Sequence, residues 1–332
     1  MATVMTRATL GDKFINGLSA ELIEVIDQAD KDYSLVSDSA HGIAGNGSTL
    51  LFKTAYDNKN ARGTIGGLGQ LGDLQLTNEG EDYKSDVYAS GYETQFDYEK
   101  YTSRVEITEE DRDDSKVAAR LMDTARLYTA AKRTANKQMF GVLNYGWTAQ
   151  ASLPAFLTFY GDAVPFFSAS HPLKNATGAT TTDGNTSTGA FSETNFETCR
   201  VMLLETLGDR AELLGYGSGN IILVVPHTLE AAAARFAKGE KRAGTTNNDI
   251  NVYDGIVTVM STKWVSAASG GSDTAYFLVD SMNSPLRYIV RRPISVSAPW
   301  TKDSNKNICI DVSARWKIGN SDWRGVVGST GV

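Results

Sequence analysis

Residues 99–145 have the sequence EKYTSRVEITEEDRDDSKVAARLMDTARLYTAAKRTANKQMFGVLNY, in which an acidic segment meets a basic one. Counted more widely, residues 73–114 carry 14 Asp or Glu against 4 Lys or Arg, whereas residues 115–145 carry 6 Lys or Arg and the single acid Asp123. Exposed charges within one compact chain interact weakly, because water and salt screen them. The separation therefore favours contact between copies of the chain, where opposite charges fix register and orientation.

The acidic segment has the alternation of a long strand from Val87 to Ile107. Every second side chain from Tyr92 to Tyr98 shares one face, and after a change of phase at Glu99–Lys100 the shared face runs from Tyr101 to Ile107. A slip of one residue moves every later side chain to the other face of a sheet. The sequence therefore predicts one long strand with a bulge or bend near residue 99.

The basic segment predicts one long helix over residues 115–145. Apolar residues recur there at helical spacing, and no glycine or proline lies between Gly91 and Gly141. Thr108–Asp111 offers a cap, and Asp113–Ser115 offers a second start with acids at the positive end of the helix dipole. About 30 residues at 1.5 Å each give a helix of roughly 45 Å.

The flanking segments complete an α+β chain. On the N-terminal side, a short amphipathic helix at 18–30 precedes an arm over 38–72 that is rich in Gly, Asn, Ser and Thr. Gly67–Gly72 matches GxGxxG, but a dinucleotide site needs a buried strand before this motif and a helix after it, and neither is predicted. On the C-terminal side we expect helices at 192–207 and 228–236 and strands at 221–225, 255–260, 275–280, 287–297 and 308–318. Their order suggests a compact α/β subdomain around 221–280.

The composition is that of an ordinary globular chain, with 332 residues of which 41% are hydrophobic and 21% charged. A net charge of −7 argues against a surface that grips DNA or an anionic membrane as a whole. The most apolar run, Ile221–Val225, is too short to span a bilayer, and Met1–Arg7 lacks the apolar stretch of a signal peptide. We therefore expect a cytosolic product with no membrane partner. Cys199 and Cys309 have neither CxxC spacing nor a nearby histidine, so no zinc site or disulfide framework is expected.

The sequence predicts no catalytic, cofactor or metal site. His41, His171 and His227 share no metal-ligand spacing. Ser168, Ser170 and His171 lack the G-x-S-x-G elbow of a nucleophile, so we expect them to have turn and packing roles. Carboxylates ahead of the long helix are expected to be solvated caps. An α/β small-molecule enzyme built on Gly215–Pro226 remains the remote alternative.

Two sets of basic residues are candidates for contact between subunits. The set on the long helix is Lys116, Arg120, Lys132 and Arg133, and its acidic counterparts are Asp82, Asp86 and Glu93. A merely solvated helix face is the alternative. The second set is Arg287, Arg291 and Arg292, which also suits a nucleic-acid patch. Because Arg291 and Arg292 are adjacent, we expect them on opposite faces of a strand, and we favour inter-subunit ion pairs.

The order of the parts resembles the major capsid proteins of tailed phages, whose fold is typified by phage HK97. Three short sequence motifs resemble the Mu-type major head subunits. They are Phe167–Leu173 followed by Asn175, Leu223–Pro226 with Leu229–Ala233, and Trp264 after a strand that begins with a glycine. In the terms of that family, the expected domains are an N-terminal arm at 1–60, an E-loop at 61–110, a P-domain at 111–200 with the spine helix at 115–145, an A-domain at 201–285, and strands returning at 286–332.

This resemblance implies a structural protein and not an enzyme. Homo-hexamers and homo-pentamers would tile an icosahedral shell around double-stranded DNA, assembled in the bacterial cytoplasm with a separate scaffolding protein, a portal and a possible decoration protein. Some relatives cross-link an E-loop lysine to an asparagine with help from a glutamate. Lys84 is the only lysine between Asp73 and Glu99, and no motif matches the other two partners, so we expect no cross-link. An encapsulin-like shell around a cargo enzyme is the alternative.

Overall fold

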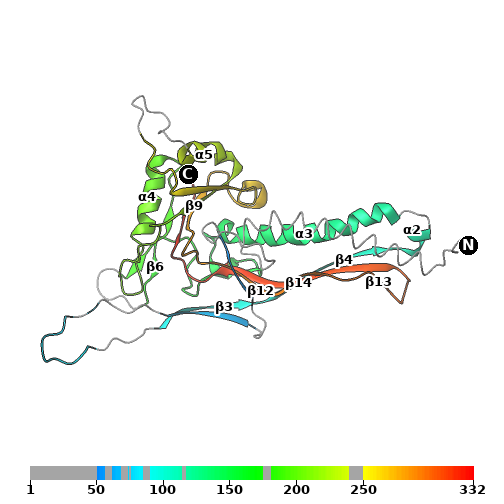
Figure 1. Ribbon diagram of the computed structural model, residues 1–332, viewed down its shortest axis with the longest axis horizontal. Helices are drawn as coiled ribbons and strands as arrows, with labels where there is room; N and C mark the ends of the chain where they lie inside the picture. The colour runs from blue at the N-terminus through cyan, green and yellow to red at the C-terminus, as the bar shows by residue number, and fades with distance from the viewer. Residues whose placement is uncertain are drawn as a thin grey trace, which may run out of the picture.

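The computed structural model describes residues 51–332, with gaps at 57–61, 69–73, 75, 85–89, 114–116, 175–180 and 239–249. The helix predicted at 18–30 lies outside the described residues, as does most of the arm. Figure 1 shows an elongated subunit, with a long helix and long strands at one end and a projecting hairpin at the other.

The bent strand and the long helix predicted from residues 87–145 are both confirmed. The strand is divided at Tyr98 into β3 (Ser90–Asp97) and β4 (Glu99–Ile107), and Thr94, Phe96 and Tyr98 are buried as the alternation requires. A short helix, α2 (Glu109–Asp113), begins after Thr108, whose Oγ1 accepts a hydrogen bond from the Asp111 amide at 3.2 Å. The long helix is α3 (Val117–Asn144).

A six-stranded sheet lies beside α3. Its main path is β1 (Lys53–Tyr56), β12 (Leu286–Val296), β14 (Ile308–Asn320) and β13 (Trp300–Thr301), and β14 also pairs with β4 and with β5 (Leu157–Thr158). The helix packs on one face only. Ile310 and Val312 contact Leu127 of α3, and the Trp316 indole donates to Gln138 Oε1 at 2.8 Å. Side chains alternate along a strand, so the odd-numbered residues of this part of β14 point to the opposite face.

We call that opposite side the open face. A hairpin of β2 (Arg62–Leu68) with β3 covers one end of it, where Ile65, Phe96 and Tyr98 pack on Ile289. Beyond this cluster, Lys100, Thr102, Arg104 and Glu106 of β4 are exposed. Among the described residues, no helix packs on the part of the open face that these side chains occupy.

The predicted α/β subdomain contains a second sheet. Its strand order is β10 (Val257–Ser261), β9 (Ile221–Val225), β11 (Tyr276–Asp280), β15 (Val326–Ser329) and β8 (Thr186–Ser187). Strand β9 is fully buried, as predicted. Helix α4 (Glu193–Leu204), capped by the Ser192 side chain, packs Phe196, Cys199 and Leu203 on this sheet, and α5 (Glu230–Lys238) packs beside it. The domain boundaries stay a prediction, and α4 crosses the one drawn between residues 200 and 201.

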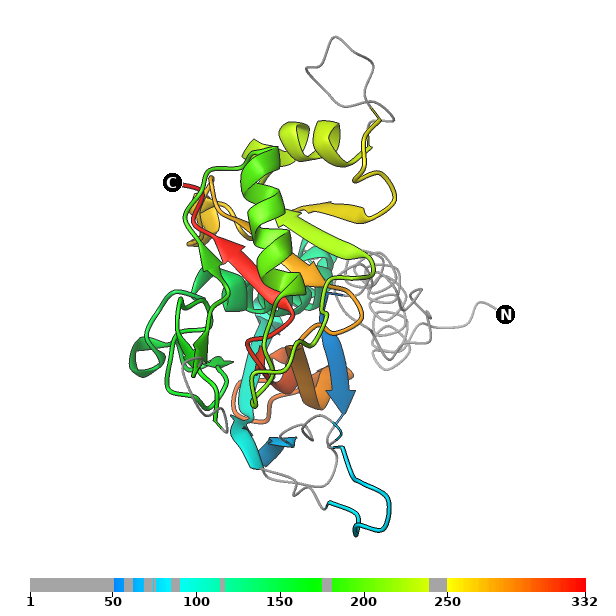
Figure 2. The ribbon, with the colours of Figure 1, turned by 90° about the vertical axis from the view of Figure 1, so that its left-hand side faces the viewer.

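Short elements join these layers. They are the 3₁₀ turns η1 (Gln150–Ser152), η2 (His227–Leu229) and η3 (Ala267–Ser269) and the two-residue strands β6 (His171–Pro172) and β7 (Thr182–Asp183). In Figure 2, which looks along the long axis, α4, α5 and the second sheet lie in the upper part of the view and the hairpin lies at the bottom. None of the helices in the described part of the chain has the length and apolar character needed to cross a membrane.

Candidate assembly surfaces

The end of the hairpin is an acidic turn, which we call the acidic tip (residues 76–84). The Glu81 amide donates to Asn78 O at 3.1 Å, and Gly80, at φ +85°, supplies the left-handed conformation that the turn needs. The Asn78 amide and side chain both donate to the Glu81 carboxylate at 3.2 Å, and these bonds lower the pKa of Glu81. The Lys84 ammonium donates to Leu76 O at 2.8 Å across the base of the turn. These local hydrogen bonds shape the turn.

The acidic tip exposes large apolar side chains, which are usually buried in a folded protein or in an interface. Leu76 is 86% exposed and Tyr83 is 95% exposed. Glu79 and Asp82 are exposed as well, so the tip presents carboxylates beside apolar groups. Burial of apolar area stabilises by roughly 25 cal/mol per Å². The tip therefore has the composition of a docking element. Of its predicted acidic companions, Glu93 is exposed on β3, and Asp86 lies outside the described residues.

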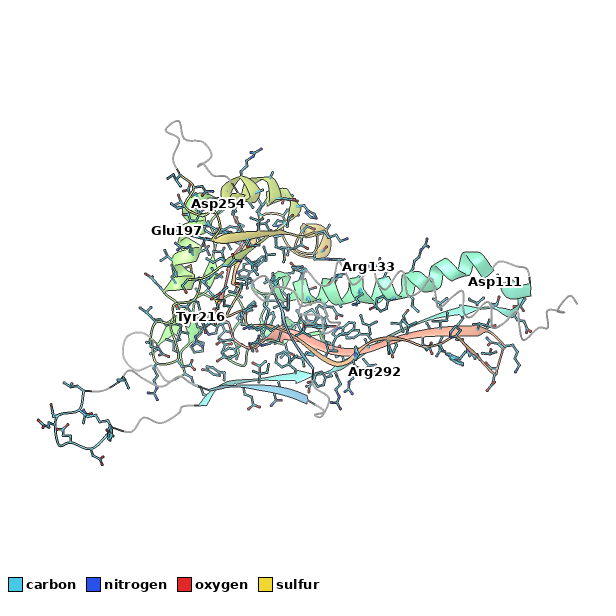
Figure 3. All side chains as sticks on the ribbon, viewed as in Figure 1. Asp111, Arg133, Glu197, Tyr216, Asp254 and Arg292 are labelled. Carbon is cyan, nitrogen blue, oxygen red and sulfur yellow. The ribbon has the colours of Figure 1, made fainter. Side chains whose placement is uncertain are left out.

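The basic face of α3 is smaller than the sequence predicts. Lys132 is only 5% exposed, with its ammonium 5.3 Å from the centre of the Tyr128 ring, so it does not lie on the exposed face. The reason is helical spacing, since position 132 falls between Tyr128 and Ala135 on the stripe that packs against the sheet. Arg133 is exposed (Figure 3). The Arg120 side chain and the whole of Lys116 are outside the described part.

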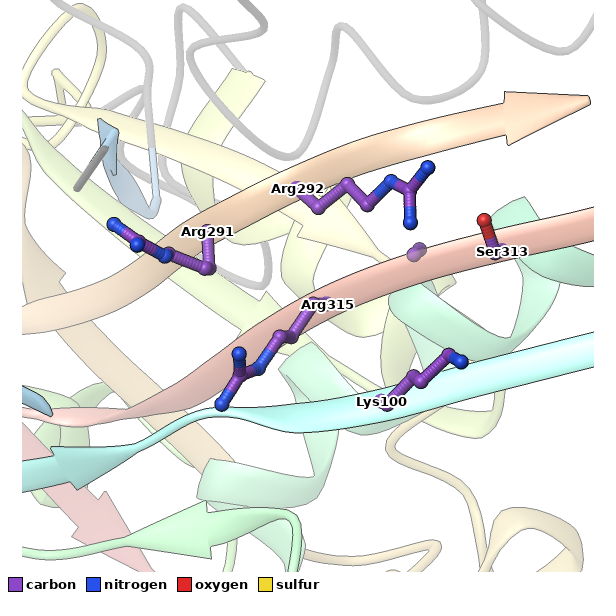
Figure 4. A pocket seen from close by; sticks show the side chains of 6 residues that line it. Lys100, Arg291, Arg292, Ser313 and Arg315 are labelled. Carbon is purple, nitrogen blue, oxygen red and sulfur yellow. The ribbon is translucent and has the colours of Figure 1, made fainter. Parts of the chain in front are cut away.

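The second predicted set of arginines is divided by the fold. Arg287 is partly buried, donates from Nη1 to Ser284 O at 3.1 Å, and has a pKa lowered by burial. Arg291 and Arg292 do not face opposite sides of β12 as predicted. Val290 pairs with Trp316 and Arg292 with Arg315, so Arg291 is the extra residue of a β-bulge. The bulge breaks the alternation, and both arginines line one hollow (Figure 4).

This hollow lies on the open face and is lined by a cluster of cations. Its volume is about 580 Å³. We call it the cationic hollow, and its lining is Lys100, Arg291, Arg292, Ser313, Ala314 and Arg315. Arg292 pairs in register with Arg315, and Arg315 with Lys100, so three cations lie side by side across β12, β14 and β4. Like charges directly opposite each other destabilise a sheet.

The three cations in register are not paired with carboxylates of the described residues. In the described parts of the chain, no carboxylate forms an ion pair with Lys100, Arg292 or Arg315. Arg315 Nε donates to Tyr98 O at 3.4 Å. Sequence reasoning missed Lys100 and Arg315, because only strand register brings residues so far apart in the chain together.

In the neighbouring part of the open face, the cations form ion pairs with carboxylates of the same chain. The Arg104 guanidinium donates to the Asp311 carboxylate at 2.5 and 3.2 Å and stacks over Trp300, whose indole also donates to Asp311 at 3.0 Å. Lys302 lies 3.5 Å from Glu106. We call this group (Arg104, Glu106, Trp300, Lys302, Asp311) the matched patch. The hydrogen bond that Asp311 accepts from Arg104 lowers the pKa of the Asp311 carboxyl.

The serines and histidine considered as a nucleophile and base make local hydrogen bonds and packing contacts. His171 is 1% exposed, with Nδ1 2.6 Å from Asp162 Oδ2 and Nε2 3.2 Å from Asn185 Oδ1. Its ring stacks on Trp323 at 4.5 Å. Ser168 Oγ accepts a hydrogen bond from the Ser170 amide at 3.2 Å. These bonds hold the His171 ring in the interior and shape the exposed turn before it.

The Gly215–Pro226 region, the basis of the enzyme alternative, is likewise bonded internally. The buried Asp280 carboxylate accepts hydrogen bonds from the Gly217 and Met282 amides and from the Asn283 side chain, at 2.9 to 3.0 Å. These three hydrogen bonds tie the loop at Gly217 to the turn that follows β11, so the Asp280 carboxylate has a structural role. Within the described ranges, no group of three His, Cys, Asp or Glu residues could hold a metal ion.

A long helix on a long sheet, a projecting hairpin and a compact α/β end define a protein with the HK97-like capsid fold. Two solved structures share this fold. The mature capsid of bacteriophage PhiM1 is 12% identical, with a TM-score of 0.53 over 88% of this chain and 89% of that chain. A structure of Mycobacterium phage Patience is 11% identical, with a TM-score of 0.51 over 96% of this chain and 87% of that chain.

The chain belongs to the phage capsid protein family, because the model of that family matches residues 91–329. It is a major capsid protein, a structural component of the virion shell. The bacteriophage JBD30 capsid is also similar, at 16% identity and a TM-score of 0.49 over 69% of this chain and 94% of that chain. A comparison with curated proteins gives no significant match. Membership of the family favours a phage shell over an encapsulin-like compartment.

Proposed function

We propose that this subunit forms hexamers and pentamers that tile an icosahedral shell enclosing double-stranded DNA. The observation that carries the proposal is the acidic tip, which projects beyond the body of the subunit (Figure 1) with Leu76 and Tyr83 almost fully exposed. A turn held in shape while it exposes apolar groups suits a contact with another copy of the chain. The charges around it would set the register of that contact.

The partners follow from the same role. Assembly would take place in the host cytoplasm with a separate scaffolding protein and a portal, and a decoration protein would bind the finished shell. A net charge of −7 suits a container from which DNA must be released, because its surface as a whole does not grip phosphates. We also propose a kinship with the Mu-type major head subunits, for which the sequence motif Phe167–Leu173 is the support.

We further propose that the shell forms without covalent cross-linking. The Lys84 ammonium is engaged with Leu76 O within its own turn. A lysine that attacks a carbonyl must be deprotonated, and burial is the usual means of lowering its pKa. Lys84 is exposed, which does not favour that chemistry.

The proposal is tested on purified full-length protein by light scattering and negative-stain microscopy, alone and with its co-expressed scaffolding protein. Closed shells or capsomers are expected. A strict monomer at high concentration under both conditions would overturn the proposal. Shells that contain an enzyme and no nucleic acid, after growth in the phage host, would replace the DNA container with a cargo compartment.

A further inference from the structure

The cationic hollow brings together positive charges that no ion pair balances within the described part of the chain. Arg292, Arg315 and Lys100 lie opposite one another on β12, β14 and β4, and none of the three is paired with a carboxylate there. On the same face, the Asp311 carboxylate is already bonded to Arg104. Like charges directly opposite each other destabilise a sheet, and an anion bound among them removes that repulsion.

We propose that the cationic hollow is a binding site for oligophosphates, which are linear chains of two or more phosphoryl groups such as tripolyphosphate or the triphosphate of a nucleotide. The site belongs to the single subunit, so it does not depend on the proposed assembly into shells. The cations come from three neighbouring strands. Strand backbones are about 4.8 Å apart, so the outer two of the three are separated by roughly 10 Å. One phosphate group reaches two neighbouring cations at that spacing, whereas a chain of phosphoryl groups reaches all three.

The donors of the hollow match the oxygens of such a chain. Arg292 and Arg315 carry guanidinium groups, which bind phosphate oxygens with two parallel hydrogen bonds, and the Lys100 ammonium supplies three donors. The β-bulge brings a fourth cation, Arg291, into the lining (Figure 4). The hydroxyl of Ser313, also in the lining, is a further donor. None of the six described residues that line the hollow is acidic.

The same lining indicates recognition of phosphate without recognition of a base. Its six described residues include no aromatic side chain on which a base could stack. Arg315 is half-buried between the exposed Arg292 and Lys100, so the hollow opens to solvent and the remainder of a nucleotide would extend outward. The volume of about 580 Å³ lies in the ordinary range of small-molecule sites. Tripolyphosphate, ATP and GTP should therefore bind with similar affinity.

The first test measures tripolyphosphate binding to the unassembled full-length protein by isothermal titration calorimetry at low ionic strength. Arg292→Gln with Arg315→Gln is expected to weaken binding about tenfold or more, the scale of a lost hydrogen bond between charged groups. Arg133→Gln with Lys137→Gln, which removes two exposed cations of α3, is the matched control and is expected to leave the affinity unchanged. Unchanged affinity in the hollow variant, or an equal loss in the α3 variant, would overturn the inference. Absence of binding to the unmodified protein would overturn it as well.

Related anions define the class of ligand in the same experiment. Orthophosphate is expected to bind about tenfold or more weakly than tripolyphosphate, because it contacts fewer of the cations. ATP and GTP are expected to bind within about threefold of tripolyphosphate, because the hollow offers no stacking surface for a base. Duplex DNA of mixed sequence is expected to bind the unmodified protein and the hollow variant equally. DNA that binds more tightly than tripolyphosphate, and loses that affinity in the hollow variant, would overturn the assignment to oligophosphates in favour of nucleic-acid phosphates. Binding of ATP without binding of tripolyphosphate would also overturn it.

The second test uses the unmodified protein, so it does not depend on how the variants fold. Exposed lysines are acetylated with and without saturating tripolyphosphate, and the products are measured by mass spectrometry. Lys100 is expected to react at least about threefold more slowly in the presence of the ligand, because its ammonium is then paired with phosphate. Lys137, exposed on α3, is the internal control and should keep its rate. Protection of neither lysine, or equal protection of both, would overturn the inference.

Discussion

The open face of the six-stranded sheet contains two regions that use charge in opposite ways. In the matched patch, Arg104 has Asp311 and Lys302 has Glu106, so each cation is paired within the subunit. In the cationic hollow, on the same strands, Lys100 and Arg315 are next to a third cation. The difference shows that the face is not uniformly solvated. In the described part of the chain, Arg104 and Lys302 are paired with carboxylates, whereas Lys100, Arg292 and Arg315 form no ion pair.

The largest expected effect follows from removing the acidic tip. Replacing residues 77–82 by two glycines removes the carboxylates of the acidic tip and is expected to abolish shell formation. The subunit itself should melt within roughly 1 °C of the unmodified protein, because exposed side chains contribute little to folding. Light scattering measures assembly and circular dichroism measures melting. Shells at ordinary yield would show that the tip is dispensable.

The matched patch should behave as an internal bond. Asp311→Asn removes the carboxylate that accepts from both Arg104 and Trp300. The melting temperature of the unassembled subunit is expected to fall by roughly 1–3 °C, the scale of a partly exposed ion pair. Asp303→Asn, at an exposed acid with no ion pair among the described residues, is the control and should leave melting unchanged. An equal fall in both variants would remove the distinction.

The cationic hollow should respond in the reverse direction. Arg292→Gln relieves repulsion with Arg315, so the melting temperature of the unassembled subunit is expected to stay the same or rise by up to roughly 2 °C. Arg133→Gln on α3 is the matched control, because arginine and glutamine have similar helix propensities. A fall for Arg292→Gln alone would mean that Arg292 already has a partner within its own chain.

These two regions also show which parts of the structure the sequence could predict. Local periodicity was enough for α3, for the bend at Tyr98 and for the buried strand β9. The burial of Lys132 could also have been predicted from local spacing, since Lys132 lies four residues after Tyr128 on the stripe of α3 that packs against the sheet. The cationic hollow could not be predicted from the sequence, because it depends on the register of β12 with β14 and on a bulge at Arg291. No local pattern encodes a pairing between residues so far apart in the chain.

The smallest expected effect is a pH dependence confined to the matched patch. The hydrogen bond from Arg104 lowers the pKa of Asp311 below its ordinary value of 3.8. A carboxyl whose pKa is lower in the folded state stabilises the fold fully above its ordinary pKa, and that stabilisation is lost as the pH falls through the lowered value. The difference in melting temperature between the unmodified subunit and Asp311→Asn should therefore be constant at pH 5 to 7 and shrink below about pH 3.5. The corresponding difference for Arg292→Gln should show no such loss, because arginine stays protonated throughout that range. If the Asp311→Asn difference does not change across pH 3 to 5, the Arg104–Asp311 bond contributes nothing to folding, and the two regions are distinguished only by what binds them.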